Sequence, residues 1–151
     1  MTLTEINTQF KAVTGAITGL NGYSFGYWSD RIRSQTYDEP GEDQTDLYPR
    51  VFWVVPTMNQ DVINRNDIYK CEVVFDDLLG YDDTGETDLS TQVEKWDLLM
   101  QLATRWVKQM QGYVITGVVQ GQVSYTLDSF GGSQRLISVI ASFDFVTKSI
   151  C

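Results

Sequence analysis

The segment from residue 90 to residue 111 constrains the fold more than any other part of the chain, because its pattern has one clear helical interpretation. Its apolar residues recur at steps of three and four, which places them along one side of a helix. These residues are Val93, Trp96, Leu99, Met100, Ala103, Trp106, Val107 and Met110. Ser90 and Thr91 are both acceptable N-caps, and Gly112 is typical of the position after a helix. Two Trp and two Met on one side require a broad apolar partner, so we predict a helix lying on a sheet.

A second amphipathic segment covers residues 2–20. Its apolar residues form a narrow seam with alternating steps of three and four: Leu3, Ile6, Phe10, Val13, Ile17 and Leu20. Thr2 and Glu5 fit the spacing of a capping box. Gly15 and Gly19 weaken the second half, each by about 1 kcal/mol relative to Ala. The sequence therefore predicts an N-terminal helix.

Stretches rich in β-branched and aromatic residues predict strands at residues 23–28, 48–55, 68–79 and 134–148. We expect the strand at 48–55 to be covered on both faces. In the strand at 68–79 we expect Lys70, Glu72 and Asp76 to lie on the wetter face. Residues 57–67 are polar and predict a loop. Two further short strands are predicted on either side of Gly121.

The predicted fold class is α+β, a mostly antiparallel β-sheet packed by an N-terminal helix and a central long helix. The length of 151 residues fits a single domain covering residues 1–151. Residues 30–46 lose their hydrophobes, and we interpret them as a long acidic loop or arm. The N-terminus lacks a basic region followed by an apolar core, and no membrane span is expected, so we expect assembly in the cytoplasm.

The net charge of -9 is unevenly distributed along the chain. Residues 38–46 hold five acids and residues 76–88 hold six, with no base in either segment. The remaining nine acids are balanced by eleven bases, so the rest of the chain is close to neutral. This argues against a surface that grips DNA, which needs clustered Lys and Arg. It is compatible with a protein past which DNA slides without binding, and equally with ordinary solvated loops.

No catalytic signature occurs in the sequence, and we expect no enzyme. The chain contains no histidine, which removes Ser-His-Asp and Cys-His systems and His-ligated zinc. A carboxylate hydrolase stays open as an alternative, because a pair of acids is sufficient for glycoside hydrolysis. The acidic run at 82–88 lacks the EF-hand spacing, and a solvated turn before a helix explains it better than a calcium site. We expect no cofactor and no metal.

In element order and size the chain resembles the tail-terminator (tail-completion) proteins of tailed bacteriophages. It resembles the related neck proteins almost as well. The resemblance rests on residues 3–20, on Tyr48-Pro49-Arg50-Val51 before the central hairpin, on residues 90–111 and on residues 136–146. It implies a structural virion protein that forms a ring, commonly a hexamer, at the head–tail junction. Such a ring terminates the tail tube and joins it to the head connector. The implied partners are further copies of the chain, the tube protein and the connector or stopper proteins, with DNA passing unbound.

The resemblance also suggests which residues take part in assembly. Subunit or partner contacts are predicted for one segment and for two residues of the last strand: Thr57, Met58, Asn59, Gln60, Asp61, Phe143 and Phe145. The last strand is expected to add to the sheet edge of a neighbour. An acidic loop facing the lumen is predicted from Asp82, Asp83, Glu86 and Asp88. Other interpretations are another neck or ring component, such as a stopper or adaptor, and a monomeric α+β protein-binding adaptor.

Overall fold

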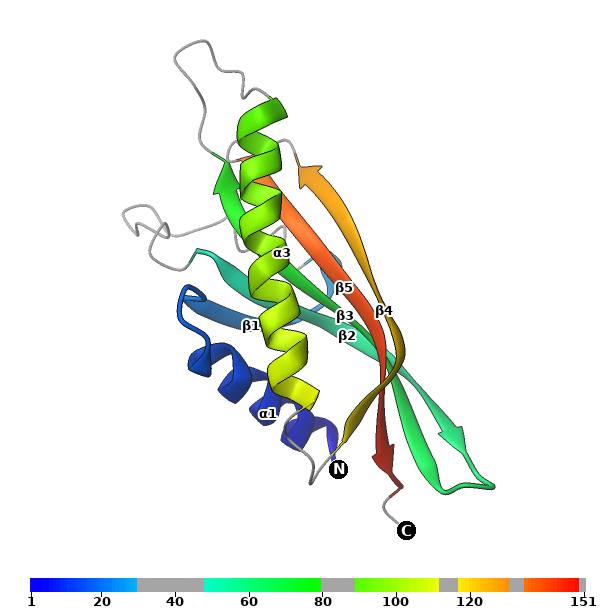
Figure 1. The fold of residues 1–151 in the computed structure, drawn as a ribbon. Coiled ribbons are helices and arrows are strands. Elements are labelled where there is room, and N and C mark those ends of the chain that lie inside the picture. Colours follow the sequence, from blue (N-terminus) through cyan, green and yellow to red (C-terminus); the bar gives the residue numbers. More distant parts are fainter. Residues whose placement is uncertain (30–47, 80–88, 112–116, 131–134, 150–151) are drawn as a thin grey trace.

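The computed structural model describes residues 1–29, 48–79, 89–111, 117–130 and 135–149. The elements follow the order α1 (Leu3–Ala16), β1 (Gly22–Gly26), β2 (Arg50–Asp61), β3 (Asn66–Leu79), α3 (Leu89–Gln111), β4 (Val118–Phe130) and β5 (Arg135–Lys148). The strands form a five-stranded sheet in the order β1-β2-β3-β5-β4. The β1–β2 pair is parallel, and the other pairs are antiparallel. Helices α1 and α3 lie on the same face of the sheet (Figure 1). The predicted α+β class is confirmed.

Helix α1 begins where the capping box predicted. The Thr2 backbone N–H donates to Glu5 Oε2 at 2.7 Å, and the Glu5 N–H donates back to Thr2 Oγ1 at 3.1 Å. The helix ends at Ala16, earlier than the expected residue 20. Gly19 has a φ of 102°, a left-handed conformation that a continuing helix cannot contain. Leu20 is nevertheless buried, so the apolar seam extends past the end of the helix.

Helix α3 seals the sheet with the predicted side chains. Trp106 and Met110 are fully buried, and Trp96 is half-buried with its indole N–H donating to the Asp128 carbonyl at 3.1 Å. Val93 is the exception, because it is 46% exposed. The expectation that Ser90 or Thr91 caps the helix is wrong, since α3 already begins at Leu89.

The predicted loop at residues 57–67 is wrong. Strand β2 continues through Asp61, and β3 begins at Asn66, so the two strands form a long hairpin closed by a turn at residues 62–65. Pro56 does not end the strand because it lies where the β2–β3 register shifts between Val54 and Thr57. A proline lacks the backbone N–H, and a bulge is a position where a ladder tolerates that loss.

Of the two short strands predicted around Gly121, at 113–119 and 122–128, the first lies partly outside the described residues. Its described end and the second strand form one strand, β4, with a register shift between Gln120 and Ser124. Gly121 lies within this bulge with a φ of 77°. A glycine with a positive φ is a common component of a bulge. The sequence signal was therefore correct for strand structure, but the glycine marks an irregularity rather than a break.

Strand β5 matches its prediction in extent but not in position. It pairs with β3 on one side and with β4 on the other, so it is an inner strand of the sheet. Over most of its length its backbone is paired on both sides. The expectation that the last strand adds to a neighbour's sheet edge is therefore wrong for the part of the chain that the structure describes.

Two glycines give opposite predictions for substitution by alanine. A Cβ on Gly117 would lie 2.6 Å from Phe145 Cε1 and closer still to Phe145 Cζ, inside the buried core. We expect Gly117→Ala to lower the free energy of unfolding by about 1–3 kcal/mol through overpacking. Gly15 lies in α1, and a Cβ added there would have no neighbouring atom within 4 Å, so Gly15→Ala should raise the free energy of unfolding by about 0.5–1 kcal/mol. Urea denaturation of both variants tests this, and equal effects would contradict it.

Candidate functional site

The β2–β3 hairpin extends away from the two helices and is the most prominent projection of the described chain (Figure 1). Its turn presents two adjacent aliphatic side chains to solvent, Val62 at 77% exposure and Ile63 at 92%. Single exposed hydrophobes are common on protein surfaces, whereas an adjacent pair at the end of a projecting hairpin forms a small apolar patch that favours a contact role. We call residues 62–65 the hairpin tip.

The Asp61 carboxylate fixes the conformation of the hairpin tip. Its Oδ1 accepts hydrogen bonds from the backbone N–H groups of Ile63 and Asn64, each at 3.1 Å. Its Oδ2 accepts from Asn64 Nδ2 at 2.8 Å. These bonds, led by that from the Asn64 side chain, hold the pKa of Asp61 below its usual value. Arg65 completes the turn with a φ of 56°.

Ser149, which directly follows β5, forms hydrogen bonds with residues at and beside the hairpin tip. Just after β5, the Ser149 backbone N–H donates to the Arg65 carbonyl at 2.8 Å. The Ser149 hydroxyl donates to Asp67 Oδ1, also at 2.8 Å, and Gln60 Nε2 donates to the same oxygen at 3.3 Å. Because three strands hold it, the tip is presented in a fixed conformation rather than as a flexible loop.

The sequence-predicted contact residues divide into two groups. Thr57, Met58, Asn59 and Gln60 are exposed on β2, where a partner can reach them. Asp61 is half-buried, and its carboxylate accepts hydrogen bonds from residues of the turn. It therefore stabilises the tip and does not offer a free carboxylate to a partner. The tip lies within residues 57–67, the segment expected from the sequence to reach a neighbour, although Val62 and Ile63 were not named individually as contact residues.

Phe143 and Phe145 do not lie on a surface that a partner can contact. Phe145 is fully buried and Phe143 is 5% exposed. Both rings lie against Phe10 of α1, with centroid separations of 6.4 Å for Phe143 and 5.4 Å for Phe145. Their predicted contact role is therefore replaced by a role in the core.

The acidic predictions lie largely outside the described residues. Asp82, Asp83, Glu86 and Asp88, and the acidic arm at 30–46, belong to ranges that the structure does not describe. The two acids that begin the second acidic segment are described and are buried. Asp76 is fully buried, and Asp77 is 7% exposed. This part of the segment belongs to the fold rather than to a solvated loop.

A pocket lies at the base of the hairpin, where β1 has ended and β2 is bulged. Its volume is about 330 Å³. The lining side chains combine an aromatic and aliphatic surface with one base and one acid: Trp28, Val54, Val55, Thr57, Lys70 and Glu72. Strand β1 pairs with β2 only as far as Val54, which leaves the edge of β2 uncovered beyond that point by any strand of the described sheet. We call this the hairpin-base pocket.

A buried polar group occupies the sheet face opposite the helices. Arg50 Nε lies 3.7 Å from Asp76 Oδ2, and the Ser138 hydroxyl donates to Asp76 Oδ1. The Arg50 guanidinium also lies over the rings of Tyr48 and Phe52, at 5.1 Å and 5.8 Å from their centroids. The expectation that Asp76 faces solvent is wrong, because alternation identified its face of the strand but not what covers that face.

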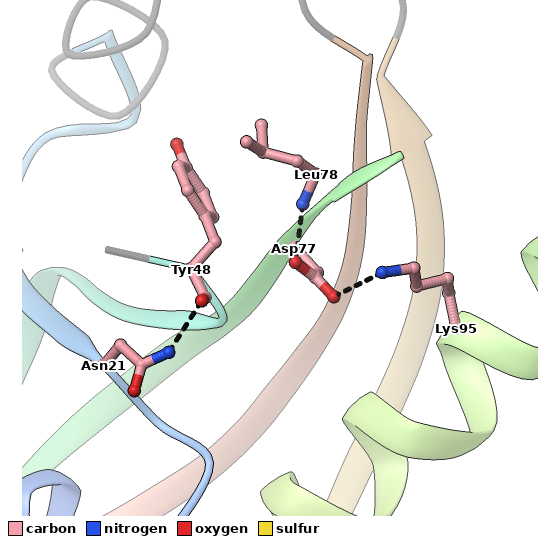
Figure 2. A network of polar contacts seen from close by, with 5 residues as sticks. All are labelled: Asn21, Tyr48, Asp77, Leu78 and Lys95. Atoms are coloured by element: carbon pink, nitrogen blue, oxygen red, sulfur yellow. Dashed lines mark hydrogen bonds and ion pairs between the residues drawn. The ribbon is translucent and has the colours of Figure 1, made fainter. Parts of the chain in front are cut away.

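Two further polar contacts position elements around the sheet (Figure 2). Lys95 Nζ of α3 lies 3.0 Å from Asp77 Oδ2, while the Leu78 backbone N–H donates to Asp77 Oδ1 at 2.8 Å. Asn21 Nδ2 donates to the Tyr48 carbonyl at 2.7 Å, which ties the start of β1 to the residues before β2. Both contacts hold elements in place and offer no reactive arrangement.

The titratable groups under α1 are kept neutral by burial. Burial raises the pKa of the Cys71 thiol to about 12, and it raises the pKa of the Tyr23 hydroxyl well above its usual value. The Tyr23 hydroxyl donates to Asn7 Oδ1 at 2.6 Å. A buried thiol with a raised pKa is not an activated nucleophile. Cys71 therefore acts as a small buried hydrophobe in the core.

Within the described ranges, no group of three or more His, Cys, Asp and Glu side chains is placed to hold a metal ion. No helix in the described part of the chain is long and apolar enough to span a bilayer. Comparison with known proteins finds neither a family model nor a curated protein that matches the chain.

Proposed function

We propose that this chain is a structural protein that acts by assembly: a ring component at the head–tail junction of a tailed bacteriophage, which terminates the tail tube and joins it to the connector. The observation that carries the proposal is the rigid hairpin with its exposed aliphatic tip. Val62 and Ile63 are among the most exposed large hydrophobes of the described chain, and the Asp61 hydrogen bonds fix their presentation. A preformed apolar projection gains contact area without an ordering cost.

The sheet edges are consistent with the same function. Strand β4 lies at one edge of the described sheet and pairs only with β5 there, so one side of its backbone remains available to another chain. Val118 and Leu127 on this strand are 57% and 50% exposed. Edge strands and projecting hairpins are surfaces by which copies of a chain associate. Because the order of the elements resembles that of the tail terminators, we propose a ring at the head–tail junction in preference to other assemblies.

The proposal is tested by the oligomeric state of the full chain. Native mass spectrometry is expected to show a closed oligomer, six times the 17.2 kDa of one chain for a hexamer, and negative-stain microscopy is expected to show rings. Added to polymerising tube protein from the same phage, the rings should bind tube ends and stop elongation. A 17.2 kDa monomer that persists at high concentration would contradict the ring and favour a monomeric protein-binding adaptor.

A further inference from the structure

We infer that the hairpin tip of one copy of this chain docks into the hairpin-base pocket of a second copy. This inference rests on the proposed function, because it names the contact by which the ring closes. The tip contributes Val62 and Ile63, and the pocket contributes Trp28, Val54 and Val55. The partner is therefore an identical chain, which offers the complementary half of the same contact.

The two surfaces match in charge as well as in apolar character. Beside its aliphatic pair the tip carries one exposed base, Arg65. Beside its apolar lining the pocket carries Lys70 and Glu72, both exposed. Arg65 of one copy can face Glu72 of the next while Ile63 enters the pocket. Such a contact buries apolar area at its centre and leaves the charged pair at its solvated rim.

A chain cannot fill its own pocket with its own tip. Tip and pocket lie on the same hairpin, separated by paired residues from Thr57↔Lys70 to Asp61↔Asn66. At about 3.3 Å per residue, Thr57 and Ile63 are roughly 15–20 Å apart along the strand. The occupant must come from another molecule.

When the tip and the pocket of one copy engage two different neighbours, the contact is heterologous. Repetition of a heterologous contact produces a closed ring when the rotation between neighbours divides a full turn. Each added copy leaves one tip and one pocket unfilled until the ring closes. The arrangement of the hairpin thus allows a single chain to close a ring without a second protein.

The test is disulfide formation between Ile63→Cys and Thr57→Cys introduced together, with Cys151→Ser to remove the C-terminal thiol. A disulfide requires Cα atoms about 4.4–6.8 Å apart, so these two positions cannot be bridged within one chain. Mild oxidation is expected to give a ladder of linked chains on a denaturing gel, ending at the ring number. Each single-cysteine variant, and the pair Ile63→Cys with Leu98→Cys on α3, should give no ladder.

A second variant measures the strength of the contact. Ile63→Asp is expected to weaken self-association by about 10- to 100-fold, the effect of losing one buried aliphatic side chain. Leu98→Asp, at a site 45% exposed on α3, should leave association unchanged. Rings that form without the disulfide ladder and survive Ile63→Asp would overturn this contact and leave the proposed function standing. A chain that is monomeric at every concentration would overturn both. Intact Ile63→Asp rings that no longer bind tube ends would assign the tip to a neck partner instead.

Discussion

Replacing Asp76 with alanine is expected to lower the free energy of unfolding by about 3–5 kcal/mol, because it removes one partner of a buried ion pair. Asp76 is fully buried and Arg50 is 4% exposed, with Nε and Oδ2 3.7 Å apart. Without the carboxylate, the buried Arg50 charge loses Asp76 as an ion-pair partner. The Ser138 hydroxyl loses its acceptor in the same substitution. Urea denaturation followed by tryptophan fluorescence measures the change.

Two further variants separate the destabilisation caused by one isolated buried charge from the net contribution of the ion pair to stability. The double variant Arg50→Met/Asp76→Leu should be closer in stability to the original chain than Asp76→Ala alone, since an apolar pair leaves no buried charge. Lys95→Ala breaks the pair with Asp77, in which the lysine side chain is 35% exposed. The Asp77 carboxylate keeps the Leu78 N–H as a donor, so the change should cost only about 1 kcal/mol. A similar cost for Asp76→Ala and Lys95→Ala would show that Arg50 is solvated, and the buried pair would then be wrong.

Periodicity predicted the helices and the last strand because their apolar residues, spaced at regular intervals, all pack into one large core. In α3 the steps of three and four identified the buried side chains Trp106 and Met110 directly. In β5 strict alternation did the same for Val139 and Phe145. These signals are local and repeated, so they hold without knowledge of the remaining chain. The α+β class follows from them.

Periodicity could not predict the hairpin, on which the candidate site depends. Pro56 and the polar residues after it have the composition of a loop, and only pairing with β3 keeps them extended. The β2–β3 pairing depends on residues outside this segment, so the composition of the segment alone cannot predict it. The same limit applies to Asp76, whose burial depends on Arg50 more than twenty residues away. Phe143 and Phe145 were predicted as contacts because a long C-terminal strand was expected at an edge, and the strand order contradicts this.

Replacing Trp106 with alanine is expected to lower the free energy of unfolding by about 3–5 kcal/mol, through lost burial and the cavity that remains. The ring is fully buried and lies 5.0 Å from the Phe10 centroid and 5.9 Å from that of Phe75, both edge-on. Its indole N–H donates to Thr14 Oγ1 at 3.1 Å, so one side chain joins α3, α1 and β3. Measurement by urea denaturation applies here too, because tryptophans at other positions remain as probes.

The matched control is Leu98→Ala on the same helix. It also truncates a large apolar side chain to alanine, but Leu98 is 45% exposed, and the change should stay within about 0.5 kcal/mol. Trp106→Phe should be intermediate, because it keeps part of the ring volume and leaves the Thr14 hydroxyl without the indole donor. If Trp106→Ala cost no more than Leu98→Ala, α3 would not seal the sheet. The rigid base from which the hairpin projects would then be lost, and with it the physical reason for assembly through a preformed tip.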